Sequence, residues 1–233
     1  MTAPVPDATP MRGTDAWRVA PRPWIGLVIW AVYIIVVYSL EAFSGVRYDA
    51  LSDSAGNLVR FGIIPLAVGS ALLIATVTAL GWWRPVLVDD RPVTRRWLWA
   101  LPALMTVVMI SNLFATRWAG IQFDYLVLAL ALGVCVGFAE EVLARGLLIT
   151  ALRARLGEPW VWFISSALFG IMHAFNAVLG SPLGTSLLQA ALAFASGSVF
   201  YLLRRLTGWL WPAILLHAIW DFSQFTSGLS PIG

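Results

Sequence analysis

Ionisable side chains lie within otherwise apolar segments of this chain, and they are of the types used in acid–base catalysis. Glu140 and Glu141 are adjacent and Arg145 follows in the same segment, while the only two histidines, His173 and His217, lie in later segments. One charged side chain at a bilayer centre costs at least about 2.5 to 3.5 kcal/mol, so such groups usually face one another around a site. A carboxylate and two imidazoles in a low-dielectric cavity are suited to activating water or relaying protons.

The spacing of these residues predicts how they divide into pairs. Glu141 and Arg145 are four residues apart, as are His217 and Asp221, so each pair shares one face of a helix. Glu140 points about 100° away from Glu141 on the same helix. We interpret Glu141 and Arg145 as an internal ion pair, which leaves Glu140 free for chemistry.

The segments that must position these residues are membrane spans. The 233 residues are 60% hydrophobic and 12% charged, with a mean hydropathy of +0.82, which excludes a water-soluble domain. All 15 basic residues are arginine, and the net charge of +3 indicates no nucleic-acid partner. The one cysteine, Cys135, excludes an internal disulfide. We therefore expect an all-α, polytopic membrane protein in contact with the lipid bilayer.

Apolar stretches near the ~20 residues needed to cross a bilayer predict about seven transmembrane helices, at 24–43, 58–80, 97–115, 123–150, 160–180, 184–203 and 209–226. On the fourth, Gly133 and Gly137 are four apart and predict close approach of a neighbouring helix. That span exceeds the bilayer thickness, so we expect it to be tilted, bent or protruding. One domain is expected, with a polar tail at 1–23, a helical domain at 24–226 and a short tail at 227–233.

The arginines predict the orientation of the spans. Alternate loops hold eleven arginines on one side, including Arg12, Arg153 and Arg204, and three on the other. The positive-inside rule then predicts a multi-pass protein of the cell membrane with a cytoplasmic N-terminus and an extracytoplasmic C-terminus. Counted from the cytoplasmic ends at ~1.5 Å per residue, the polar groups on the fourth, fifth and seventh spans lie about 12 to 20 Å deep. This shared depth favours one pocket.

Three motifs give the chain a resemblance to a known family. Glu140-Glu141-Val-Leu-Ala-Arg145 matches EExxxR, Phe169-Gly-Ile-Met-His173 matches FxxxH, and His217-Ala-Ile-Trp-Asp221 matches Hxxx(N/D). In this order on apolar helices, they resemble the CPBP family of intramembrane proteases, which includes the type II CAAX prenyl endopeptidases and bacterial bacteriocin-processing and self-immunity (Abi) proteins. The resemblance covers about 123–226, the expected protease core.

The resemblance implies an endopeptidase that hydrolyses a peptide bond of a membrane-associated peptide or lipidated protein with a glutamate-activated water and no cofactor. Glu140 would be the general base, His173 would orient the water, and His217 and Asp221 would stabilise the oxyanion. Glu141, Arg145 and Phe169 would support them. The CAAX-cleaving branch typically has Asn where this chain has Asp221. An ionised Asp cannot donate a hydrogen bond, so Asp221 would be protonated, accept from His217 and fix its tautomer, or bind a metal.

Other functions remain open on the sequence alone. Two histidines and two carboxylates could bind zinc through Glu140, His173, His217 and Asp221, although HExxH is absent. A non-catalytic immunity or scaffold protein could bind a peptide in the same pocket, and a transporter could use it as a proton relay. A serine or cysteine nucleophile is disfavoured because neither Ser165, Ser166 nor Cys135 lies in a recognised nucleophile motif. Oligomeric state, substrate identity and prenylation have no sequence signal.

Overall fold

Helices make up the regular structure of this protein. The computed structural model describes residues 18–227, and within that range no strand occurs, only an isolated bridge between Val88 and Trp209. Residues 1–17, with Arg12 and most of the predicted tail at 1–23, lie outside the described residues, as do residues 228–233 of the predicted tail at 227–233. The all-α prediction is confirmed.

The element order follows the apolar segments of the sequence. The first part of the chain forms α1 (Pro23–Phe43), η1 (Tyr48–Asp53), α2 (Ala55–Asn57), the π-helical η2 (Leu58–Ile63), α3 (Ile64–Leu80), α4 (Trp83–Leu87), η3 (Arg96–Trp99), α5 (Ala100–Ala115) and η4 (Trp118–Gly120). The second part forms α6 (Phe123–Glu141), the π-helical η5 (Val142–Leu148), α7 (Ile149–Leu152), α8 (Glu158–Ala174), η6 (Phe175–Leu179), α9 (Leu183–Thr207) and α10 (Trp211–Ser227).

In the part of the chain that the structure describes, six continuous helical stretches are long and apolar enough to cross a membrane: Pro23–Phe43, Ala55–Leu80, Arg96–Ala115, Phe123–Leu152, Glu158–Leu179 and Leu183–Thr207. They correspond to the first six predicted spans. The seventh corresponds to α10, whose 17 residues lie at the lower end of the spanning range of about 17 to 25 residues. Large apolar side chains such as Ile35 and Phe114 face outward, as expected of a surface in lipid. The chain is therefore a multi-pass membrane protein.

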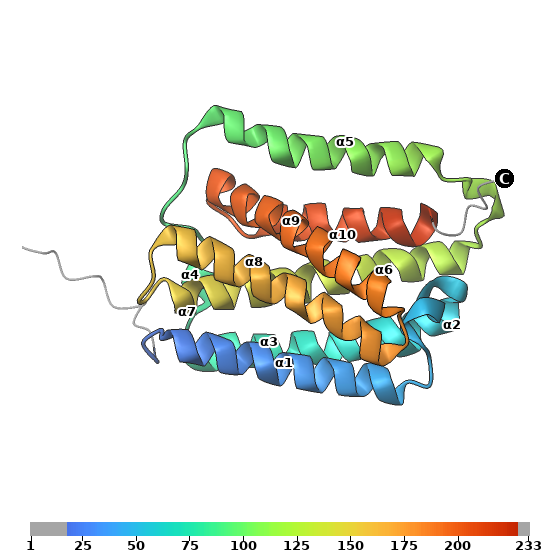
Figure 1. Ribbon diagram of the computed structural model, residues 1–233, viewed down its shortest axis with the longest axis horizontal. Coiled ribbons are helices and arrows are strands. Elements are labelled where there is room, and N and C mark those ends of the chain that lie inside the picture. The colour runs from blue at the N-terminus through green and yellow to red at the C-terminus, as the bar shows by residue number, and fades with distance from the viewer. Residues whose placement is uncertain (1–17, 228–233) are drawn as a thin grey trace, which may run out of the picture.

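The long helices run side by side, with α1 and α3 on one side of the bundle, α5 on the other, and α6, α8, α9 and α10 between them (Figure 1). The closest pairs are α6 with α10 and α8 with α9. A Cβ atom at Gly133 or Gly137 would lie only 2.5 Å from the carbonyl oxygen of Ala218 or 2.7 Å from that of Ile214. The predicted close approach at these glycines is confirmed, and the partner helix is α10.

The predicted fourth span is a continuous stretch from Phe123 to Leu152, but it is not α-helical throughout. Its segment η5, near the C-terminal end of the stretch, is a π-helix in which every residue is buried. A π-helix in the middle of an α-helix commonly occurs near a functional site. Here it begins directly after Glu140 and Glu141 and contains Arg145.

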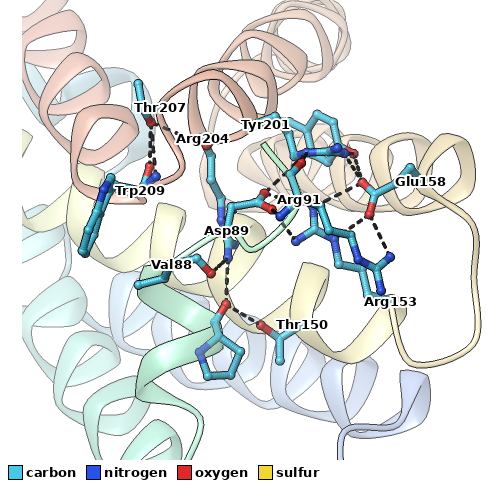
Figure 2. A network of polar contacts seen from close by, with 12 residues as sticks. Val88, Asp89, Arg91, Thr150, Arg153, Glu158, Tyr201, Arg204, Thr207 and Trp209 are labelled. Atoms are coloured by element: carbon cyan, nitrogen blue, oxygen red, sulfur yellow. Dashed lines mark hydrogen bonds and ion pairs between the residues drawn. The ribbon is translucent and has the colours of Figure 1, made fainter. Parts of the chain in front are cut away.

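A polar network ties several helix ends together at one end of the bundle (Figure 2). Arg153, just after α7, pairs with Asp89 at 3.0 Å and with Glu158, the first residue of α8, at 2.7 Å. Arg205 near the end of α9 pairs with both Glu158 and Asp89, and Arg204 lies 3.9 Å from Asp89. Arginines from two loops that were predicted to share one membrane side therefore meet in one cluster.

Asp89 is the buried acid at the centre of this network. Burial alone would raise the pKa of its carboxyl, but the hydrogen bonds and charge of Arg153, together with the charge of Arg204, outweigh burial and hold the pKa below its ordinary value. The backbone N–H of Asp89 also donates a hydrogen bond to the carbonyl oxygen of Gly208. Gly208 directly follows α9 and has a positive φ of 76°. The network thus fixes the ends of α7, α8 and α9 relative to one another.

Candidate active site

Three helices bring the four predicted catalytic side chains together. Oε2 of Glu140 on α6 lies 4.0 Å from Nε2 of His173 on α8 and 3.8 Å from Nε2 of His217 on α10. The same nitrogen of His217 lies 3.8 Å from Oδ2 of Asp221. All four side chains line one cavity. Residues that are 81 positions apart in the sequence thus face a common space.

Glu140 and Glu141 have different surroundings because successive helical residues point about 100° apart. Glu140 borders the cavity with 13% of its side chain exposed, and its buried Oε2 has no hydrogen-bond partner in the described part of the chain. Glu141 is fully buried and does not line the cavity. Of these two adjacent acids, Glu140 is consequently the one that a molecule in the cavity would meet.

Glu141 and Arg145 form the ion pair that the spacing predicts. Oε1 of Glu141 lies 3.0 Å from Nη1 of Arg145, and both side chains are fully buried. The guanidinium also lies over the ring of Phe169, with 3.8 Å between Cζ and the ring centroid, a cation–π contact. Space for Arg145 depends on Gly197 of α9, where a Cβ would lie 2.5 Å from Nη2. The pair is thereby part of the packing between α6, α8 and α9.

The partner of His217 differs from the one that its spacing favours. Nδ1 of His217 lies 3.0 Å from Oε1 of Glu141, within hydrogen-bond distance, whereas Asp221 is at 3.8 Å from Nε2. Asp221 is thus beyond hydrogen-bond distance of His217, and Glu141 is the hydrogen-bond partner of Nδ1 because α10 packs directly on α6. The ring of His217 also stacks on Phe200, with centroids 4.5 Å apart. Glu141 is thus both the ion-pair partner of Arg145 and the hydrogen-bond partner of His217.

His173 is oriented by its own helix and by Phe169. Its Nδ1 lies 2.8 Å from the carbonyl oxygen of Phe169, so this nitrogen carries the proton and donates. In the neutral ring, Nε2 is then an acceptor directed toward Glu140. Phe169 contacts both imidazoles edge to face, at centroid distances of 4.9 and 5.9 Å. Phe169 positions the two rings and has no polar atom of its own to contribute.

The cavity that holds these groups has a volume of about 690 Å³. Apolar side chains from α3, α5, α6 and α9 form much of its wall, including Leu66, Leu104 and Leu192. This size and lining suit a peptide segment or an apolar chain better than a small polar ligand.

A second group of polar residues lines the same cavity and was not predicted as part of the site: Tyr38, Glu41, Tyr48, Asn176 and Gln189. Tyr38 donates to the carbonyl of Met172 at 2.5 Å, Asn176 donates to Gln189 at 2.9 Å, and Gln189 donates to Tyr48 at 2.5 Å. Burial raises the pKa of Tyr48 to about 12, so its hydroxyl stays protonated. None of these five residues belongs to the three sequence motifs, so no sequence signal placed them at the site.

The geometry also bears on a metal centre. Within residues 18–227, no group of three or more His, Cys, Asp or Glu side chains has the arrangement needed to hold a metal ion. Glu140, His173, His217 and Asp221 come nearest, but their facing atoms are 3.8 to 4.0 Å apart. Ligand atoms at about 2.0 to 2.2 Å from a zinc ion would have to draw closer together.

Comparison with known proteins agrees with the motifs. Residues 122–223 match the family model described as type II CAAX prenyl endopeptidase Rce1-like. This stretch includes all four candidate catalytic residues. The segment at residues 122–223 is thus similar to the Rce1-like family, in agreement with the motifs. No curated protein and no solved structure matches the chain.

Proposed function

We propose that this protein is an intramembrane endopeptidase in which Glu140 activates a water molecule to hydrolyse a peptide bond of a membrane-associated peptide or lipidated protein. The observation that carries the proposal is the position of the Glu140 carboxylate. Its unpartnered Oε2 faces Nε2 of both histidines across gaps of 4.0 and 3.8 Å, inside a cavity between membrane helices.

The gap between Glu140 and His173 suits a bridging water. A separation of 4.0 Å is too long for a direct hydrogen bond, and one water can span it. Because both Oε2 of Glu140 and Nε2 of His173 are acceptors, the water would donate a hydrogen to each. Its lone pair would then point away from both, toward a substrate carbonyl. Glu140 would take one proton as the water oxygen bonds to the carbonyl carbon, and would later deliver that proton to the leaving nitrogen.

His217 and Asp221 would act on the oxyanion formed in that step. Nδ1 of His217 donates to the Glu141 carboxylate, so His217 must be protonated on both nitrogens to donate from Nε2 as well. The negative charge of Glu141 beside Nδ1 would stabilise this imidazolium. Asp221 adds a further carboxyl group 3.8 Å from Nε2 and would stabilise the same positive charge. In this scheme Asp221 acts through His217 instead of donating to the oxyanion itself.

The orientation that we propose for the protein in the membrane is based on the positions of its arginines. The clustering of Arg91, Arg153, Arg204 and Arg205 at one end of the bundle supports assigning that end to the cytoplasm of a cell-membrane protein. Cysteine-accessibility labelling in intact cells, with single cysteines placed in the loop at residues 153–157 and in the loop at 116–122, tests it. Labelling of the first loop from outside the cell would reverse the orientation.

The decisive test of activity compares purified wild type, Glu140→Gln and His173→Ala on membrane-anchored fluorogenic peptides in detergent, with and without a chelator. We expect Glu140→Gln to lower turnover about 10²- to 10⁴-fold, the contribution of a general base. Cys135→Ala, on the same helix and outside the cavity lining, is the matched control and should keep full activity. Equal turnover by all variants refutes the proposal.

Two further results, one from this experiment and one that also requires a functional assay and a peptide-binding assay, would identify the alternatives. Loss of wild-type activity on chelation, with recovery on adding zinc, would show a metal-dependent protease. Undiminished biological function of Glu140→Gln, with peptide binding retained and no cleavage by wild type, would show a non-catalytic immunity or scaffold protein.

A further inference from the structure

Glu41 is a buried acid in the cavity that the proposed reaction does not use. It lies near the end of α1, one helical turn after Tyr38, and only 9% of the residue is exposed. Its side chain lines the same cavity as Glu140. No hydrogen bond or ion pair joins the Glu41 carboxyl to any other residue of the described chain. A carboxyl group without a partner in the described chain, on a residue that is nine-tenths buried, is costly, so its presence requires an explanation.

Several polar groups on this side of the cavity are paired among themselves, whereas the buried hydroxyl of Tyr33 on α1 has no hydrogen-bond partner in the described chain. Asn176, Gln189 and Tyr48 form a hydrogen-bonded chain, and Tyr38 is bonded to the carbonyl of Met172, the residue before His173. The Tyr38 contact shows that α1 runs past the end of α8 that holds His173. Glu41, three residues further along α1, is about 4.5 Å beyond Tyr38 along the helix axis. Glu41 is therefore close to the proposed reaction centre but separate from it.

The charge of the cavity wall indicates what could pair with Glu41. Among residues 18–227, three carboxyl groups line the cavity, those of Glu41, Glu140 and Asp221, and no arginine does so. The two histidines are both placed beside Glu140, and only His217 is also near Asp221. Arg145 is held by Glu141 outside the cavity lining. Within this wall, Glu41 has no cationic counterpart, so the counter-charge has to enter with the ligand.

We propose that Glu41 is a specificity-determining residue that binds a basic side chain, arginine or lysine, of the substrate peptide at a fixed distance from the bond to be cleaved. This inference rests on the endopeptidase function proposed above and adds a substrate class to it. A carboxylate in a low-dielectric cavity forms a strong charge-assisted hydrogen bond with a guanidinium or ammonium group. An apolar wall with one acidic subsite selects an apolar peptide with one basic residue.

The test uses membrane-anchored peptides that are identical except for one arginine, moved position by position, and matched peptides with the neutral isostere citrulline. At one or two positions, wild type is expected to cleave the arginine peptide with a kcat/KM about tenfold higher, equivalent to about 1.4 kcal/mol. Glu41→Gln should reduce this ratio to about one, with little change for the citrulline peptides, while Glu41→Asp should keep a preference. An unchanged ratio in Glu41→Gln, or no arginine preference in wild type, overturns the inference.

A binding measurement makes the test independent of turnover. Glu140→Gln protein and the Glu41→Gln/Glu140→Gln double variant are titrated with the same peptides, and the arginine-over-citrulline affinity ratio should be about tenfold in the first and about one in the second. Equal ratios overturn the role of Glu41 whatever the activity. If Glu140→Gln lacks activity and Glu41→Gln keeps the wild-type preference for arginine over citrulline, only the inference about Glu41 fails. If Glu140→Gln cleaves the peptides normally, the endopeptidase proposal fails. Thermal unfolding checks that each variant is folded.

Discussion

Replacing Gly137 by alanine is expected to separate α6 from α10 and so disturb the candidate site without changing any polar residue. The added Cβ would lie 2.7 Å from the carbonyl oxygen of Ile214 and 2.9 Å from the amide nitrogen of Ala218. Both atoms belong to the backbone, so no side chain can rotate away. To reach an ordinary contact of 3.4 Å, the helices must move apart by about 0.7 Å at this point.

The size of the effect follows from where that movement occurs. Overpacking of a tight contact costs about 1 to 3 kcal/mol, which for a chain of this length lowers the unfolding temperature by about 2 to 12 °C. His217 lies between the two contacted residues on α10, so its Nε2 would move relative to Glu140 by a similar fraction of an ångström. A misplacement near 1 Å can reduce turnover about 10²-fold. Thermal unfolding by tryptophan fluorescence and peptide cleavage measure the two effects.

Gly184→Ala provides the matched control for Gly137→Ala. Gly184 is also within a membrane helix, α9, but a Cβ there meets nothing within 4 Å. The unfolding temperature of the Gly184→Ala variant should equal that of wild type or be slightly higher, because alanine is more favourable than glycine in a helix by up to about 1 kcal/mol. If Gly137→Ala matches Gly184→Ala in both unfolding temperature and turnover, the backbone contact does not hold the site together.

Two further predictions concern buried charges. Glu141→Gln leaves Arg145 buried without its counter-charge and should lower the free energy of unfolding by about 3 to 5 kcal/mol, measured by thermal unfolding in detergent. The double variant Glu141→Gln/Arg145→Met should recover most of this loss. An equal loss in both variants would contradict a charge effect. Asp89→Asn should lower the unfolding temperature at pH 7 because Arg153 and Arg204 lose their acid. Since the pKa of Asp89 is below its ordinary value in the folded protein, this stabilisation is complete above about pH 4 and is lost as the pH falls further. The difference between wild type and Asp89→Asn should therefore be constant from pH 7 to about 4 and shrink below it; a difference that grows on acidification would contradict this.

Local spacing predicted those features that depend on one helix and its immediate neighbour. The pairing of Glu141 with Arg145 follows from four-residue spacing, and the close approach at Gly133 and Gly137 follows from small residues on one face. The cost of ionisable groups in lipid also predicted that Glu140 and His173 would share a pocket. These inferences need no knowledge of which helices are neighbours in three dimensions.

Features that depend on the packing order of the helices could not be predicted in this way. The hydrogen bond of His217 to Glu141 exists because α10 packs on α6, whereas spacing along α10 favoured Asp221 as its partner. Glu41 was missed because it lies about 100 residues before the motifs, and nothing in the sequence places α1 beside the end of α8. The π-helix η5 was also unpredicted, since a long apolar segment has the same composition in either helical form.

The network around Asp89 has a consequence for how this protein responds to its host membrane. Because ion pairs within the protein join α7, α8 and α9 at one end, the relative heights of these helices do not depend on lipid contacts. A thinner or thicker bilayer would then be accommodated by tilting the bundle or by deforming the lipid. Sliding of one helix past another would require these charges to separate. The alignment of the carboxylate and the imidazoles should accordingly persist across membranes of different thickness.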